Sequence, residues 1–262
     1  MDILLFMSMM LLGFVGSFFS GLLGIGGAII NYPLLLFAPS GLGLAPFTAQ
    51  EVAAISMFQV FFASLAGVVA FRKKGGQTAV VHKELVLYMG SCILLGSLVG
   101  GFGSRYLQEE VINIIYGTLA VIAVVLMLIP SRVKQDTMQG EIAFNKPIAA
   151  AAAFMVGTVS GVVGAGGAFI LIPIMLTVLK IPARVTIASS LAIVFISAIG
   201  GVIGKITAGP IPVWPTVFVV LGSLIGAPLG SRASSKINVR YLRYGLVVLI
   251  AATAVKVWAS IL

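Results

Sequence analysis

Two glycine-rich stretches contain the residues best suited to bind a small anion. Residues 20–28 and 160–168 each place several glycines between apolar segments. A helix that begins after such a stretch offers free backbone N–H groups and a partial positive charge, and glycine lets a ligand approach the backbone closely. We therefore predict that these glycines line a substrate site. The candidate glycines are Gly24, Gly26, Gly27, Gly164, Gly166 and Gly167.

Uncharged polar side chains near these stretches extend the candidate site. A desolvated anion needs hydrogen-bond donors to replace its lost water, and hydroxyl and amide groups supply them. The candidates are the hydroxyls of Ser56, Ser189 and Ser190 and the amides of Asn31 and Gln59. Small residues in apolar helices also serve close helix packing, so this second interpretation stays open for all of them. We predict no catalytic group, metal site or cofactor.

The two stretches are copies of one another, 140 residues apart. Between residues 20–36 and 160–176, nine of seventeen aligned positions are identical, including a proline at 33 and 173. The apolar segment 28–38 would be about 16 Å long as a helix, roughly half of a bilayer core. Interrupted apolar segments at matching places in two halves are typical of a transporter's binding site.

Composition indicates whether this chain folds in water or in a lipid bilayer. Of its 262 residues 60% are hydrophobic and 9% are charged, and the mean hydropathy is +1.18, which excludes a soluble globular domain. The net charge of +9 lies in loops, so we expect a lipid bilayer and no nucleic acid as partner. The one cysteine, Cys92, excludes a disulfide framework. The chain is therefore expected to be an all-α polytopic membrane protein.

The helices that must position the site are also repeated. We expect helices over 3–23, 50–71, 85–103 and 111–130, and a second set in which 186–207 matches 50–71. This predicts a first transmembrane repeat over 1–130, a cytoplasmic linker over 131–146 and a second repeat over 147–262. Each repeat would hold a Gly-rich interrupted or re-entrant helix pair and three transmembrane helices. Glycines at 96, 100, 222 and 226 are predicted to serve packing.

Loop charge decides how the repeats are oriented. If each glycine stretch joins two segments, thirteen Lys and Arg share one side of the membrane, and Arg105 and Lys205 remain on the other. If each stretch crosses only once, the charges divide almost evenly. The positive-inside rule favours the first arrangement. We therefore predict inverted-topology repeats with both termini outside.

These motifs carry a resemblance to a known family. The paired glycine stretches each followed by proline, the serine-rich segment 188–192, and the repeated Gly-Ser-Leu-Val/Ile-Gly motif at 96–100 and 222–226 resemble the TauE/SafE family. The resemblance spans the whole chain. It implies a bacterial inner-membrane permease for sulfite or an organosulfonate, which we expect to be an exporter working by alternating access. Its substrate would be a small anion, and a homo-oligomer stays open.

The sequence also leaves other functions open. A transporter of another small anion or organic acid, or a non-transporting membrane scaffold, remains an alternative. An enzyme is not expected, because one His, one Cys and seven carboxylates supply no catalytic cluster. The glycine stretches lack the third glycine of a dinucleotide-binding motif. We expect Glu51 to favour its helix start, His82 to be solvated, and Lys205 to extend to the membrane surface or to attract anions.

Overall fold

The computed structural model describes residues 3–23, 28–44, 46–73, 81–128, 144–234, 247–248, 251–252 and 254–259. Within these ranges every regular element is helical, which confirms the all-α prediction. Six of the described helices (α1, α3, α4, α6, α8 and α9) are long and apolar enough to cross a membrane. The labelled helices are α1 (Ile3–Leu23), α2 (Ala28–Gly41), α3 (Ala49–Lys73), α4 (Lys83–Gly103), the short 3-10 helix η1 (Ser104–Tyr106), α5 (Glu109–Leu128), α6 (Lys146–Val163), α7 (Ala168–Thr177), α8 (Ala183–Ala208) and α9 (Val213–Ser234).

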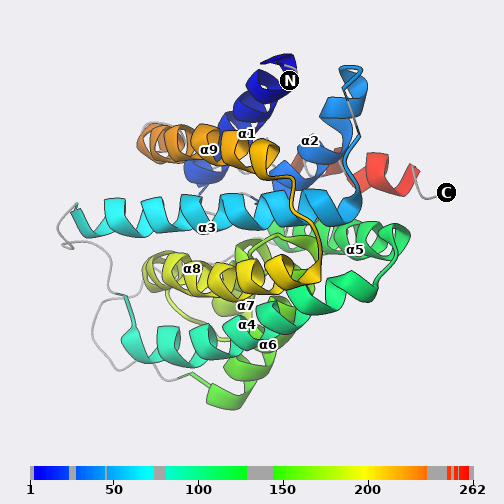
Figure 1. The fold of residues 1–262 in the computed structure, drawn as a ribbon. Helices are drawn as coiled ribbons and strands as arrows, with labels where there is room; N and C mark the ends of the chain where they lie inside the picture. Colours follow the sequence, from blue (N-terminus) through cyan, green and yellow to red (C-terminus); the bar gives the residue numbers. More distant parts are fainter. Residues whose placement is uncertain are drawn as a thin grey trace.

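Helix α3 lies between two groups of helices (Figure 1). On one side α1 packs along α9, with α2 beside them, and on the other α4 packs against both α6 and α8. The two closest pairings, α1 with α9 and α4 with α6, each join the first helix of one half of the chain to the fourth helix of the other half. The two halves therefore pack against each other through both of these helix pairs.

The helix starts follow from capping residues in the sequence. Thr48 precedes α3, and the Glu51 carboxylate accepts hydrogen bonds from the Thr48 N–H at 2.9 Å and its hydroxyl at 3.1 Å, while the Glu51 N–H donates to the Thr48 Oγ1. This is a capping box, which satisfies two free donors at once. It confirms the helix-start role expected for Glu51. At α6 the Asn145 side chain accepts from the Ile148 N–H, and a proline follows in the first turn.

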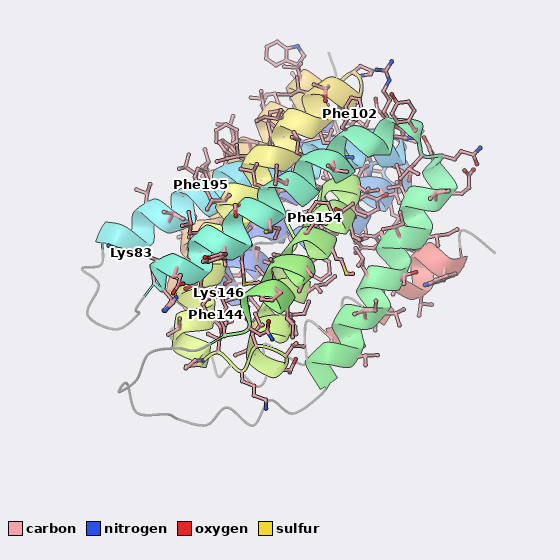
Figure 2. All side chains as sticks on the ribbon, turned by 90° about the horizontal axis from the view of Figure 1, so that it is seen from below. Lys83, Phe102, Phe144, Lys146, Phe154 and Phe195 are labelled. Atoms are coloured by element: carbon pink, nitrogen blue, oxygen red, sulfur yellow. The ribbon has the colours of Figure 1, made fainter. Side chains whose placement is uncertain are left out.

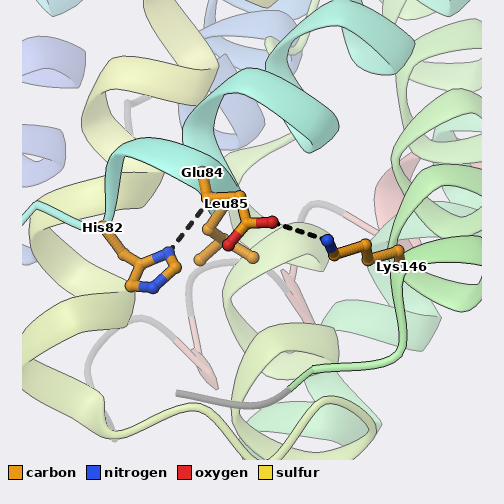
Figure 3. A network of polar contacts seen from close by, with 4 residues as sticks. All are labelled: His82, Glu84, Leu85 and Lys146. Atoms are coloured by element: carbon orange, nitrogen blue, oxygen red, sulfur yellow. Dashed lines mark hydrogen bonds and ion pairs between the residues drawn. The ribbon is translucent and has the colours of Figure 1, made fainter. Parts of the chain in front are cut away.

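His82 has a structural role at the start of α4. Its Nδ1 accepts a hydrogen bond from the Leu85 N–H at 3.1 Å (Figure 3). The expectation of a merely solvated His82 was wrong, because an imidazole nitrogen can replace the usual Ser or Asp as an N-cap acceptor. In the same view Glu84 pairs with Lys146 at 2.6 Å. This ion pair joins the first turns of α4 and α6, so these two helices start at the same end of the molecule.

Glycines let α4 and α6 pack with their backbones in contact. A Cβ added to Gly96 would lie 2.2 Å from the Phe154 carbonyl oxygen, and one added to Gly100 would lie 1.9 Å from that of Thr158. Figure 2 shows Phe154 on α6 beside α4, whose two ends are marked by Lys83 and Phe102. The equivalent glycines of α9, at 222 and 226, contact the α1 backbone at Met10 and Phe14 in the same way. The packing role predicted for these four glycines is confirmed.

Helices α3 and α8 lie side by side and run in opposite directions (Figure 1). The rings of Phe61 and Phe195, which the sequence alignment pairs, stack at 5.4 Å between centroids. On either side of them Gly67 faces Leu191, and Gly201 faces Met57. These four residues are also paired in the alignment, 134 positions apart, so the two contacts are equivalent. Equivalent residues that exchange contacts in this way are the signature of a two-fold relation.

Candidate functional site

The second glycine stretch forms a sharp break between α6 and α7. Gly164, Gly166 and Gly167 have φ values of 77°, 65° and 75°, in the left-handed region that L side chains rarely adopt. The Ser160 carbonyl accepts from both the Gly164 and the Ala165 N–H, which closes the end of α6. The chain then starts again as α7, a helix of ten residues, about 15 Å long. The predicted half-length helix after this stretch is confirmed.

The break contains buried backbone donors. Residues 161–169 are all buried. The N–H groups of Gly166 and Gly167 make no recorded hydrogen bond to any described residue, although they lie directly before the N-terminus of α7. Buried N–H groups without an acceptor are rare in proteins. This arrangement is a ready site for an acceptor-rich, negatively charged ligand.

Hydroxyl groups surround this break from α3 and α8. A Cβ added to Gly166 would lie 2.5 Å from Val60 Cγ1 and 3.5 Å from Val194 Cγ1. Ser56 lies one turn before Val60 on α3, and Ser197 lies one turn after Val194 on α8. Both hydroxyl oxygens are fully buried and have no hydrogen-bond partner in the part of the chain that the structure describes. Two unpaired hydroxyls therefore lie on the helix faces that contact the glycine break.

A third unpaired hydroxyl, that of Ser97, comes from α4. Its oxygen would lie 2.8 Å from a Cβ on Gly201, and its carbonyl would lie 2.4 Å from one on Gly161. Ser97 is thus held between α8 and the end of α6. Sequence analysis missed it as a site residue because it interpreted the motif at 96–100 only as packing. We name Ser56, Ser97, Ser197 and the break at 164–167 the central polar site; its side chains are uncharged.

The predicted amides lie elsewhere in the molecule. Gln59 Nε2 donates to the Gly13 carbonyl at 3.2 Å and to Ser17 Oγ at 2.7 Å, so its side chain crosses to α1. Asn31 contacts α1 one turn further on, at Gly16. The side-chain oxygens of both amides are buried without a partner. The two amides therefore form a separate polar group that contacts α1, the helix that leads into the first glycine stretch.

The remaining predicted residues have different positions. Ser190 lies one turn before Val194 and is buried, on the same face of α8 as Ser197. Ser189 accepts a hydrogen bond from the His82 N–H at 3.2 Å, which places it at the end of the bundle where α4 begins. Gly24, Gly26 and Gly27 lie outside the described residues. Binding by any of these residues stays a prediction.

Lys205 differs most from its expected position. It is 3% exposed, and its Nζ donates to Ser104 Oγ at 2.9 Å and to the Val162 carbonyl at 2.7 Å. The expectation that it extends to the membrane surface was wrong. Its position follows from the close crossing of α4 and α8, where a Cβ on Gly101 would lie 3.0 Å from the Gly204 Cα. Among the described residues, no group of three His, Cys, Asp or Glu side chains is placed to hold a metal ion.

Comparison with known proteins assigns the chain to a family. The family model described as sulfite exporter TauE/SafE matches residues 9–257. The probable membrane transporter protein YunE of Bacillus subtilis is 22% identical over 251 residues, which cover 90% of each chain. A probable membrane transporter protein of Xylella fastidiosa is 28% identical over 266 residues, covering 95% of this chain and 94% of the relative. The probable membrane transporter protein MJ0441 of Methanocaldococcus jannaschii is 22% identical over 256 residues, covering 92% and 91%.

No solved structure matched the chain. The family match extends over both halves and includes the two glycine stretches and the central polar site. Of the six described helices long enough to cross a membrane, it includes five completely and α1 from residue 9 onward. The resemblance inferred from the glycine and serine motifs is confirmed. The chain is therefore a multi-pass membrane protein of a transporter family. This chain belongs to the TauE/SafE sulfite exporter family.

Proposed function

We propose that this protein is a permease that exports a small sulfur-containing oxyanion, sulfite or an organosulfonate, across the inner membrane. The observation that carries the proposal is the pair of buried N–H groups at Gly166 and Gly167, before the N-terminus of α7, for which the described residues provide no acceptor. An oxyanion would accept from these donors and from the unpaired hydroxyls of Ser56, Ser97 and Ser197.

The chemistry of the central polar site supports an anion that is bound and released many times. Its side chains are hydroxyls, and its positive potential comes from backbone dipoles. Such donors replace water without forming a strong ion pair, so release is not prevented. The sulfur-containing class of the substrate rests on the family description, sulfite exporter.

We also infer that the two halves are inverted repeats, and that their relative motion opens this site to one side of the membrane at a time. Equivalent helices α3 and α8 run in opposite directions, and their equivalent residues exchange contacts around the Phe61–Phe195 stack. An axis along the membrane normal would make α3 and α8 parallel, so the antiparallel arrangement supports an axis in the membrane plane. The first and second repeats, 1–130 and 147–262, would then rock against each other.

The His82–Ser189 contact supports the same topology. It places the start of α8 beside the start of α4, and the Glu84–Lys146 pair adds the start of α6. The basic loops before these three helices would therefore share one side of the membrane. The positive-inside rule makes that side the cytoplasm, with both termini outside.

Purified protein in sealed proteoliposomes tests the function. Radiolabelled sulfite, methanesulfonate, acetate and chloride would be loaded separately, and their efflux compared between the parent protein and a Ser56→Ala, Ser197→Ala double variant. We expect efflux of the sulfur oxyanions alone, and a loss of about tenfold or more in the double variant, since each hydrogen bond to a charged group contributes about 1.5–3 kcal/mol. Efflux of acetate or chloride only would indicate another anion, and no efflux of any anion would favour a scaffold.

A further inference from the structure

A cavity with charged residues in its lining lies at the end of the molecule where α8 ends and α3 begins. Its volume is about 280 Å³. Its lining brings together two cations from different elements, Lys205 of α8 and Arg105 of η1. The remaining lining residues are Thr48, Gln50, Glu51, Ala54, Ser104, Ala208, Gly209 and Pro210.

Lys205 is a buried cation for which the described residues provide no carboxylate partner. Its two recorded hydrogen bonds go to neutral oxygens, those of Ser104 and Val162. An ammonium group has three donors, so one remains for another acceptor. A buried charge is normally paired, because desolvation without a counter-charge is costly. The described residues therefore leave Lys205 without a negatively charged acceptor for its third donor.

Glu51, the one acidic side chain in the lining, caps the start of α3 and does not pair with Lys205. The Glu51 carboxylate accepts from Thr48 twice in the capping box of α3. Arg105 is exposed, lines the same cavity and follows Ser104 in the sequence. With Lys205 and Arg105 against Glu51, the cavity has a net positive charge. This charge and the spare donor of Lys205 both favour a small anion.

A structural role explains only part of this arrangement. The Val162 carbonyl is among the last of α6, and a cation there stabilises the end of a helix. That role would account for one hydrogen bond of Lys205. It does not account for the second cation or for the cavity between the two.

We propose that a small inorganic oxyanion binds in this cavity between Lys205 and Arg105. The site is distinct from the central polar site but lies next to it. Ala54 lines the cavity, and the carbonyl of the preceding Ala53 contacts Gly164, where a Cβ would lie 1.9 Å from it. An anion bound here is therefore separated from the glycine break by one layer of α3 backbone. The proposal concerns binding and does not depend on transport at the central site.

Site-directed labelling in reconstituted full-length protein tests this site. Ala208 lines the cavity and is half-buried, so Ala208→Cys in a Cys92→Ala background places one thiol there. We would compare its reaction with an anionic and a cationic methanethiosulfonate, with and without sulfate as the probe anion. We expect the anionic reagent to be favoured by about tenfold, as charged clefts concentrate counter-ions. We also expect sulfate to slow the labelling.

Charge variants give the decisive comparison. Lys205→Met and Arg105→Gln should each remove the sulfate protection and lower the preference for the anionic reagent. Lys83→Gln, at the other end of α4 and outside this cavity, should leave both unchanged. Because Lys205→Met also removes the hydrogen bonds that Val162 and Ser104 accept, its folding is checked by its melting temperature. Arg105 is exposed, so Arg105→Gln keeps the test decisive even if Lys205→Met does not fold.

A last variant separates this site from the central one. Gly166→Val fills the glycine break and leaves the cavity lining intact, so sulfate protection of the thiol introduced at position 208 should persist. The proposal would be overturned if sulfate did not slow labelling of the thiol at position 208 in the protein without charge variants. It would also be overturned if sulfate still slowed the labelling in both charge variants. Loss of transport in Gly166→Val with protection retained would show two separate anion sites.

Discussion

At the scale of single residues, the buried hydroxyls of α3 differ in whether a protein group forms a hydrogen bond with them. Ser56 Oγ has no hydrogen-bond partner among the described residues, whereas Ser64, also buried in α3, donates to the Phe61 carbonyl at 3.0 Å. An unpaired buried polar group costs about 1–3 kcal/mol relative to a paired one. The same hydroxyl becomes favourable only when a ligand accepts from it. The unpaired hydroxyl of Ser56 therefore fits the proposed role in binding an anion.

This difference makes a prediction for Ser56→Ala. Without anion its melting temperature should equal or exceed that of the parent, because the variant removes an unpaired group. Its anion affinity should fall by about tenfold to a hundredfold, the value of one hydrogen bond to a charged group. Thermal unfolding and isothermal titration with sulfite would measure both. Ser64→Ala is the matched control, with unchanged affinity; equal losses of affinity in the two variants would contradict the assignment.

Gly166 supplies a second test at this scale. A side chain there meets two separate obstacles, a φ of 65° and Val60 Cγ1 at 2.5 Å. Gly166→Ala should therefore destabilise the protein by about 1–2 kcal/mol from the backbone alone. Adding Val60→Ala makes room for the new Cβ but leaves the backbone strain, so it should recover only part of the loss. A double-mutant cycle by thermal unfolding measures this coupling; complete recovery would show that the strained backbone has no cost.

At the scale of elements, most of the helices were predictable from the sequence. The segment 3–23 was matched residue for residue by α1, and 50–71 lies within α3, because long apolar runs between charged or glycine-rich loops leave few alternatives. The packing glycines were also found, since a motif repeated in two halves indicates equivalent contacts. Periodicity cannot show which neighbour a helix meets, however. For that reason the environments of Ser97 and Lys205 could not be predicted, because they depend on the crossing of α4 with α6 and α8.

The α4–α6 contact gives a prediction with an internal control. Gly100→Ala would place a Cβ 1.9 Å from the Thr158 carbonyl oxygen, so the two helices must separate. Overpacking of this kind costs about 1–3 kcal/mol. Gly103→Ala, in the last turn of the same helix, meets nothing within 4 Å and gains helix propensity. The first variant should melt several degrees lower and the second should not; equal melting temperatures would refute backbone contact at this crossing.

At the scale of the whole molecule, the decisive question is how the two halves lie in the membrane. The duplication could be recognised from sequence, but its orientation rested on loop charges alone. The structure adds an independent argument, since α3 and α8 run in opposite directions and stack their equivalent phenylalanines. In a protein with inverted halves, closing one half against the other on one side opens the opposite side. The central polar site lies at the crossing of the two halves, where such a motion would alternate its access.

The position of Lys180 distinguishes the two orientations. Lys180 lies between α7 and α8, and Gly209 follows the other end of α8; both are exposed. In the inverted arrangement Lys180 faces the cytoplasm together with the loop before α4, and Gly209 faces outside. In the parallel arrangement the two positions exchange sides. The single-cysteine variants Lys180→Cys and Gly209→Cys in a Cys92→Ala background, labelled on intact cells with a membrane-impermeant maleimide, should therefore react only at position 209. Lysis before labelling should make both react, which controls for access to the thiol. Labelling at position 180 on intact cells would exclude inverted repeats, and with them the proposed alternation of access between the two halves.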